Sequence, residues 1–244
     1  MKLLNGATLR TLQFGSMALA TSALVACGGG ADSGGSPVGT VSGTAAVGAA
    51  LANASITLSC KNGSGSATAN SNGAYTATFA FDGPCAITAN SGAITIHSFA
   101  AGAGTFNVTP LTELLLDYIA GQLGTSVSGL LSGITSNPSF QSALSNSTVI
   151  ANAEAAVVTL IKDTYGVTLS SSSFLTVSFT PGAGGADADL DTLQADGAIT
   201  SDGQPAASLA AAAEAAGAAA PISGGNAGPT GGTGGSGGTG ATTK

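Results

Sequence analysis

Few residues of this chain could form a catalytic centre. His97 is the single histidine, so a nucleophilic triad would depend entirely on it. It alternates with Ile94 and Ile96, which predicts a place on the polar face of a strand rather than in a catalytic pair. Glu113 and Asp117 lie four residues apart and could form a carboxylate pair on one helix face. We favour the alternative for this spacing, a helix start with a solvated acidic face.

Alternating carboxylates at Asp187, Asp189 and Asp191 are a weak candidate for a metal site. Such carboxylates can converge on a hard cation such as calcium. An EF-hand loop that begins at Asp187 needs Gly and Glu where Thr192 and Ala198 stand. An acidic helix start, favoured by the helix dipole, is therefore the preferred interpretation. We expect no bound metal and no cofactor.

The N-terminus has the layout of an export signal. Lys2 and Arg10 precede a charge-free stretch over 14–25, which is too short to span a bilayer as a helix. The stretch ends in Leu-Val-Ala-Cys, with the cysteine at position 27. This ending resembles the lipobox of bacterial lipoproteins. An ordinary signal peptide with a chance cysteine is the alternative.

The lipobox resemblance implies a signal peptide over 1–26 and a lipid on Cys27. Attachment through two or three acyl chains is effectively stable, whereas one chain holds a protein only marginally. Gly28 at the next position implies sorting to the outer membrane. Residues 27–37 are rich in Gly and Ser and are expected to form a flexible tether.

Cys60 and Cys85 remain once Cys27 is assigned to lipid. An exported protein meets an oxidising compartment, where two thiols in a small β module normally pair. We therefore predict a disulfide, which would contribute roughly 3 kcal/mol by constraining the unfolded chain. Metal binding is the alternative, but the sequence has no Cys-x-x-Cys motif.

The composition excludes several classes of function. The 244 residues include 38 Gly, only 5 Lys plus Arg, and 12 Asp plus Glu, for a formal charge of −7. So few basic residues leave no surface for nucleic acid. Removing Lys2 and Arg10 with the signal leaves 3 basic and 12 acidic residues, or −9. Anionic headgroups repel such a chain, so the lipid must hold it at the membrane.

Residues 38–109 alternate between apolar and polar positions in short segments separated by turns, which predicts six or seven strands. Asn72-Gly73 predicts a two-residue hairpin. The runs 43–60 and 66–79 resemble a carboxypeptidase-regulatory-like, or transthyretin-like, domain, with Ala50 where that family often has Pro. The resemblance implies an antiparallel β-sandwich with a structural, adhesive or accessory role, sometimes in contact with carbohydrate. The matching residues are Gly48, Leu51, Ala54, Ile56, Gly73 and Tyr75.

Residues 110–220 are predicted to be mainly helical. Thr109-Pro110 is a cap followed by proline in the first turn, and apolar residues then recur at helical spacing. The run 107–124 resembles a junction found in uncharacterised proteobacterial lipoproteins. We expect an extended segment around Phe174–Phe179, and an Ala-rich helix over 205–220 that docks only loosely, because alanine buries little area.

The last residues, 221–244, form a Gly/Thr-rich tail that is predicted to be disordered. Within it, 234–238 matches the Gly-x-Ser-x-Gly motif of hydrolases. That motif works on a turn between a strand and a helix, and the tail predicts neither element. We interpret the match as accidental.

These observations predict an α+β protein, with a small antiparallel β-sandwich followed by helices. We expect a lipid-anchored protein of the cell envelope with a structural or binding role, an envelope protein or glycan as partner, and no catalytic activity. Glycan or peptide binding through sandwich loops near Tyr75 and Phe81 is the first alternative. A hydrolase that uses His97 as its base is the second.

Overall fold

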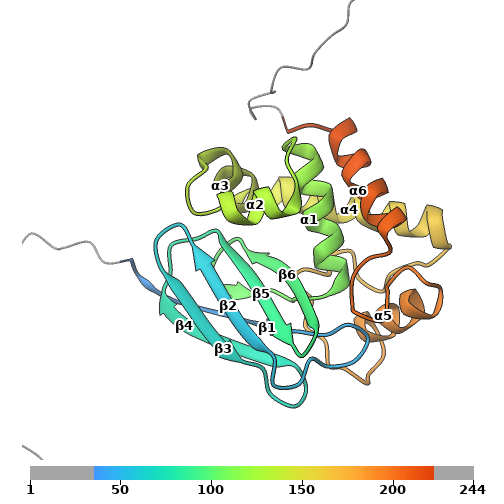
Figure 1. Ribbon diagram of the computed structural model, residues 1–244, viewed down its shortest axis with the longest axis horizontal. Coiled ribbons are helices and arrows are strands. Elements are labelled where there is room, and N and C mark those ends of the chain that lie inside the picture. Colours follow the sequence, from blue (N-terminus) through green and yellow to red (C-terminus); the bar gives the residue numbers. More distant parts are fainter. Residues whose placement is uncertain (1–35, 223–244) are drawn as a thin grey trace, which may run out of the picture. The chain divides into compact units, whose positions relative to one another are not determined.

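The computed structural model describes residues 36–222 as an α+β protein in which strands come first and helices follow (Figure 1). The predicted signal peptide, the predicted lipidation site at Cys27 and the 234–238 motif lie outside the described residues. The strands are β1 (Val38–Thr44), β2 (Ser55–Cys60), β3 (Ser64–Thr68), β4 (Ala74–Ala80), β5 (Cys85–Ser91), β6 (Ile94–Ala100) and β7 (Gly104–Thr105). The helices are α1 (Pro110–Gln122), α2 (Val127–Gly133), α3 (Pro138–Ser145), α4 (Ser147–Tyr165), α5 (Ala186–Ala195) and α6 (Ala207–Ala219).

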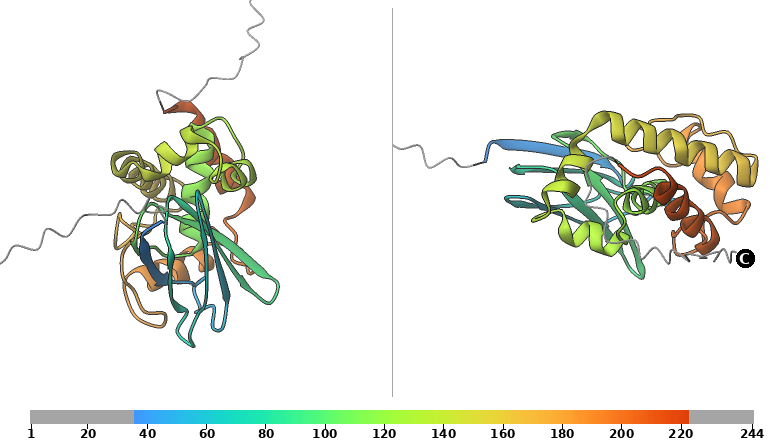
Figure 2. Two further views of the ribbon diagram at one scale, coloured as in Figure 1. Left: turned by 90° about the vertical axis from the view of Figure 1, so that its left-hand side faces the viewer. Right: turned by 90° about the horizontal axis from the view of Figure 1, so that it is seen from above.

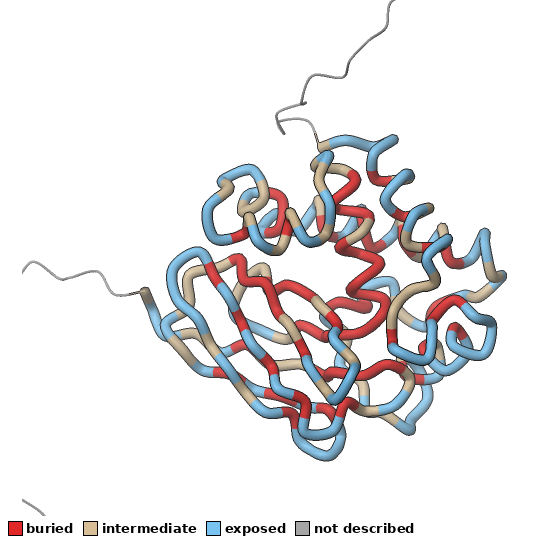
Figure 3. Tube along the Cα trace, viewed as in Figure 1, coloured by how far each residue is buried: buried red, intermediate tan, exposed pale blue. Residues whose placement is uncertain are grey.

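The strands form two sheets, one of three strands in the order β4-β1-β7 and one of four in the order β3-β2-β5-β6. All pairs are antiparallel except β1 with β7. Period-two alternation gives β2 and β4 a buried face: on β2, Ile56 and Leu58 are buried while Thr57 and Ser59 are exposed. Buried side chains of both sheets and of the helices belong to one hydrophobic core (Figure 3).

The hairpin predicted at Asn72-Gly73 is wrong. A turn does form there: Gly73 has a φ of +74°, and the Asn70 side chain accepts hydrogen bonds from the backbone N–H groups of Asn72 and Ala74. The strands on its two sides, however, pair in different sheets, β3 with β2 and β4 with β1. The turn forms as its local sequence predicts, but long-range pairing decides which strands become partners.

The predicted disulfide between Cys60 and Cys85 is present. The two residues face each other directly in the register of β2 and β5, with Cα atoms 3.9 Å apart. Both cysteines are buried. Their chain neighbours Ser59 and Ala86 therefore point to the opposite face of the four-stranded sheet, toward the helices.

Helix α1 begins as the sequence predicts. The Thr109 hydroxyl accepts from the Thr112 backbone N–H, the Thr112 hydroxyl reaches back to the Thr109 N–H, and Pro110 occupies the first turn. The helix packs against β6 on one side and against α4 and α6 on another (Figure 2). It is buried along most of its length, so it joins the sheet to the remaining helices.

The expectation that the last helix docks loosely is wrong. Helices α1 and α6 cross at two glycines: a Cβ atom at Gly121 would lie 2.1 Å from the Glu214 carbonyl oxygen, and one at Gly217 would lie 2.0 Å from the Tyr118 carbonyl oxygen. Small residues let the two backbones approach closely, so the contact depends on fit rather than on the size of the side chains.

The segment expected to be extended around Phe174–Phe179 is instead an irregular loop. Side chains from elsewhere satisfy its backbone: the Asn107 amide donates to the carbonyls of Phe174 and Val177, and Glu154 accepts from the Leu175 N–H at 2.9 Å. Phe174 and Leu175 are buried in the core. Anchoring by these two polar residues replaces pairing with a neighbouring strand.

Within 36–222, no single helix has both the length and the apolar character needed to cross a membrane. The pair α3 and α4 meets the length and composition requirements only when taken together, and the two helices are bent by 73° where they meet.

Candidate functional site

A cavity of about 630 Å³ lies between the four-stranded sheet and the helices. The sheet contributes Thr88 and His97, helix α1 contributes Glu113 and Asp117, and the turn before α6 contributes Gln204. Helix α2 closes another side with Ser128 and neighbouring residues. None of the described residues that line it is a lysine or an arginine. The wall therefore combines the two carboxylates and several hydroxyl groups with apolar side chains, those of Ala86, Val127, Leu131, Pro205 and Ala210.

Strand register brings the sheet residues together. Thr57 of β2 is opposite Thr88 of β5, and Thr88 is opposite His97 of β6. Because side chains alternate between faces, all three lie on the face opposite the disulfide. The four-stranded sheet thus presents a row of hydroxyl groups that ends at the histidine.

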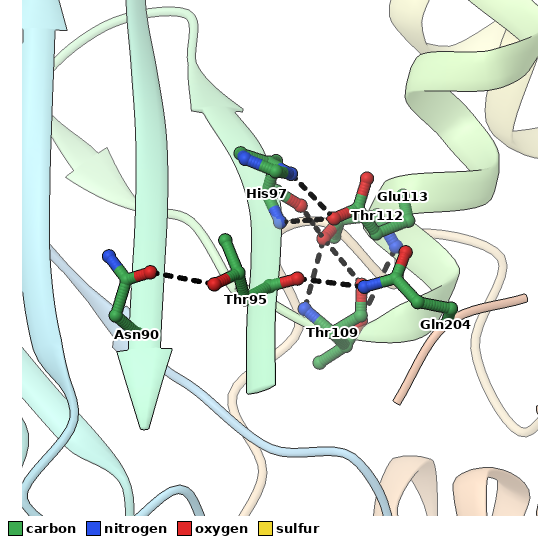
Figure 4. Close-up of polar contacts among 7 residues, drawn as sticks. All are labelled: Asn90, Thr95, His97, Thr109, Thr112, Glu113 and Gln204. Carbon is green, nitrogen blue, oxygen red and sulfur yellow. Dashed lines mark hydrogen bonds and ion pairs between the residues drawn. The ribbon is translucent and has the colours of Figure 1, made fainter. Parts of the chain in front are cut away.

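His97 lies on the polar face of β6, as expected, and forms a hydrogen bond with Glu113 on the cavity wall, in contrast to the expectation for Glu113 (Figure 4). Glu113 Oε1 lies 2.8 Å from His97 Nδ1 and 2.5 Å from the His97 backbone nitrogen. The Glu113 side chain is only 7% exposed, so it is not part of a solvated helix face. Because a carboxylate accepts hydrogen bonds, Nδ1 donates, and Nε2 is left as the acceptor nitrogen.

The first turn of α1 holds this contact in place. The Thr112 hydroxyl donates to the His97 carbonyl at 2.9 Å, so consecutive residues of α1 bind both the backbone and the ring of His97 (Figure 4). Thr112 also belongs to the capping box of the helix. The start of α1 and the orientation of the imidazole are therefore fixed by the same contacts.

Asp117 lies one turn after Glu113 and lines the same cavity. Burial, reinforced by the neighbouring charges of Glu113 and Glu214, raises the pKa of its carboxyl to about 7. The prediction that Glu113 and Asp117 share a helix face is confirmed, but this face turns toward the cavity. A carboxyl that titrates near neutrality can bind or release a proton at physiological pH.

Gln204 closes one end of the cavity and was missed by sequence reasoning. Its side-chain amide donates to the Thr95 carbonyl at 2.7 Å, and the Thr95 hydroxyl donates to Asn90 at 2.8 Å (Figure 4). These bonds tie the turn before α6 to the edge of the four-stranded sheet. No local motif marks Gln204; only its position before Pro205 and an Ala-rich helix suggested a helix start.

The three aspartates of α5 do not converge. Asp187 is buried and accepts from the Gly182 N–H at 2.8 Å, while Asp189 accepts from both the backbone and the hydroxyl of Ser170. Among residues 36–222, no three His, Cys, Asp or Glu side chains are grouped so that they could hold a metal ion. Two of these carboxylates thus bind the loop that precedes α5.

Tyr75 and Phe81, named as candidate binding residues, lie away from the cavity. Tyr75 is on β4 rather than on a loop, is 3% exposed, and donates its hydroxyl to the Phe106 carbonyl at 2.6 Å. Burial raises the pKa of its hydroxyl well above the ordinary value. Phe81 is half-buried, with its ring centroid 5.7 Å from that of Phe79. Tyr75 is therefore a core residue.

The arrangement can perform two kinds of chemistry. The carboxylates of Glu113 and Asp117 can accept hydrogen bonds from a cationic group, and Nε2 of His97 can accept a proton from water or from a hydroxyl. A scan against protein-family models, a search of curated proteins and a search of solved structures each gave no match to this chain.

Proposed function

We propose that this is a lipid-anchored, non-catalytic protein of the cell envelope that binds a small amine-bearing ligand in the cavity between sheet and helices. The observation that carries the proposal is the pair Glu113 and Asp117 on the cavity wall, where no described lysine or arginine neutralises them. An amine brings the positive charge that such a wall lacks.

The charge of the cavity decides between classes of ligand. Glu113, Asp117 and nearby Glu214 repel anions, and this mutual repulsion contributes to the raised pKa of Asp117. A bound ammonium group would relieve the repulsion and favour the charged form of Asp117. Coulomb attraction is stronger in a partly buried site than in bulk water. Cations are therefore the favoured ligands.

The envelope location rests on the sequence: the basic start, the apolar stretch and the Leu-Val-Ala-Cys ending at Cys27. The β region is proposed to be a transthyretin-like module, a type used for structural and accessory roles. Metabolic labelling with a palmitate analogue tests the anchor. We expect a labelled band for the wild type and none for Cys27→Ser; equal labelling of both would refute lipidation at this cysteine.

The ligand class is tested with ethanolamine and its uncharged counterpart ethylene glycol. Chemical-shift titration at pH 8 is expected to show binding of ethanolamine but not of ethylene glycol, with perturbed resonances in α1 and β6. Asp117→Asn is expected to weaken ethanolamine binding about tenfold, since a charged hydrogen bond contributes 1.5–3 kcal/mol. Asp163→Asn, which removes an exposed carboxylate of α4, is the matched control. Equal binding of both compounds would contradict the proposal.

The second candidate function is hydrolysis, favoured by the 2.8 Å contact between His97 and Glu113. Glu113 orients the ring, so Nε2 could remove a proton from a water molecule in the cavity. A panel of ester and amide substrates tests this function. Activity that His97→Gln abolishes would support it, whereas activity that survives His97→Gln would remove His97 as the base.

A further inference from the structure

The outer face of the four-stranded sheet continues the cavity as a strip of hydroxyl groups. Thr57 and Ser59 of β2 and Ser64 and Ser66 of β3 are all exposed on this face. Together with Leu58 and Gly65 and with Thr78 and Phe79 of β4, they line a second hollow, of about 480 Å³. Ser59 lines both this hollow and the cavity that holds His97. The two depressions therefore adjoin, and together they extend from Asp117 on α1 across to β3.

This strip carries no charge. Between 38 and 109 the charged or titratable acid and base residues are Lys61, Asp82 and His97 only, and neither Lys61 nor Asp82 lines either depression. A serine or threonine hydroxyl both donates and accepts hydrogen bonds. Such a surface matches a ligand that is itself covered with hydroxyl groups, and it gives no particular advantage to an ionic polymer.

The four strands are also wide enough for more than one sugar ring. Neighbouring strands lie about 4.8 Å apart, so the row from β3 to β6 spans roughly 14 Å. This row contains Ser66, Thr57, Thr88 and His97, in register. One end is acidic and the rest is neutral and hydroxylated.

We propose that the ligand is a short glycan of amino sugars, with one free amino group bound at Glu113 and Asp117 and the following sugar rings on the strip from Ser59 to Ser66. This inference rests on the proposed function, because it assigns the amine of the cavity ligand to the first sugar. The strip adds affinity by hydrogen bonds from sugar hydroxyls to serine and threonine side chains.

The test compares glucosamine with the glucosamine hexasaccharide by calorimetry at pH 7. The wild type is expected to bind the hexasaccharide at least about tenfold more tightly than the monomer. The double variant Thr57→Val/Ser66→Ala removes two hydroxyl groups that face each other across β2 and β3. It is expected to bind the hexasaccharide about tenfold more weakly than the wild type does. Binding of the monomer is expected to stay unchanged, because neither residue lines the acidic cavity.

A matched control removes the same kind of pair from the other sheet. Thr76→Val/Ser42→Ala alters two residues that face each other across β4 and β1, and is expected to bind the hexasaccharide like the wild type. The fully N-acetylated hexasaccharide is expected to bind far more weakly, because its amines are blocked.

The outcomes separate the two proposals. If glucosamine binds and Asp117→Asn weakens it, but the hexasaccharide gains nothing, the glycan inference is overturned and the amine site stands. If the hexasaccharide gains affinity that Thr76→Val/Ser42→Ala also removes, the strip on β2 and β3 is the wrong surface. If neither sugar binds, the glycan inference is overturned, and the amine site then stands or falls by the ethanolamine titration.

Discussion

The outer faces of the two sheets carry the same kind of side chain but have different surroundings. On the three-stranded sheet, Thr40 and Thr78 bind each other at 3.0 Å and are exposed. On the four-stranded sheet, Thr88 stands beside His97 under helix α1, which adds two carboxylates. The outer face of the three-stranded sheet is therefore polar but uncharged at these hydroxyl groups. On the four-stranded sheet, the helices cover a similar face and add carboxyl groups that can titrate.

The disulfide is expected to make the largest contribution to stability among the features that distinguish the two sheets. It lies entirely within the four-stranded sheet. Reduction is expected to lower the free energy of unfolding by about 3 kcal/mol through the added entropy of the unfolded chain. Urea unfolding with and without reductant measures this change. Cys60→Ala/Cys85→Ala is the control and is expected to be insensitive to reductant. An unchanged midpoint for the wild type would contradict a stabilising bridge.

Gly121→Ala tests whether the cavity depends on the close crossing of α1 and α6. The new methyl group would collide with the Glu214 carbonyl, and overpacking of this kind costs about 2 kcal/mol. Hydrogen exchange is expected to speed up in α6 more than in β1 and β4. The matched control, Gly102→Ala, places a methyl group in open space at a position without a positive φ. Equal losses in both variants would show that the helix crossing is not tight.

Asp117 gives the helix-covered face a dependence on pH that the other face lacks. Its pKa in the folded protein is raised to about 7, so the folded state holds a proton that the unfolded chain releases near pH 4. Stability is therefore expected to fall as pH rises from about 4 to about 7. The loss is of the order of 1 kcal/mol, because water screens a partly exposed carboxyl.

The Asp117→Asn variant removes this titration and is expected to show a flatter stability profile over the same pH range. Thermal unfolding at pH 5 and at pH 8 measures the difference between wild type and variant. Parallel profiles for the two proteins would mean that Asp117 keeps its ordinary pKa.

Tyr75 provides the smallest expected effect and probes the three-stranded sheet alone. Removing its hydroxyl in Tyr75→Phe leaves the Phe106 carbonyl without this partner, and is expected to cost about 1 kcal/mol of stability. Because Tyr75 lies away from the cavity, binding of ethanolamine is expected to be unchanged. A variant that loses binding but keeps its stability would restore Tyr75 as a binding residue.

Local signals in the sequence predicted much of the secondary structure. The cap at Thr109-Pro110 begins α1 where expected. Asn137 caps α3 with its side chain, and Gly166 ends α4 in the left-handed conformation. These features depend on one to four neighbouring residues. The disulfide also followed from the sequence, since only two cysteines remained after Cys27 was assigned to lipid.

Long-range geometry decided what the sequence could not predict. His97 meets Glu113 because the register of β5 and β6 points the histidine toward the first turn of α1, and residue spacing carries no record of this direction. The tight docking of α6 depends on Gly121 and Gly217 meeting the opposite backbone, whereas the sequence suggests only a helix with little area to bury. Composition indicates a shortage of charge, but the fold brings three of the carboxylates, those of Glu113, Asp117 and Glu214, close to one another.

The most direct test of the central claim is an NMR titration of the Asp117 side-chain carboxyl, with and without glucosamine. The account predicts a midpoint near pH 7 in the free protein, because burial and two acidic neighbours oppose ionisation. It predicts a lower midpoint with glucosamine bound, since a nearby ammonium group favours the carboxylate. A midpoint near 4 that glucosamine leaves unchanged would contradict an acidic, amine-binding cavity.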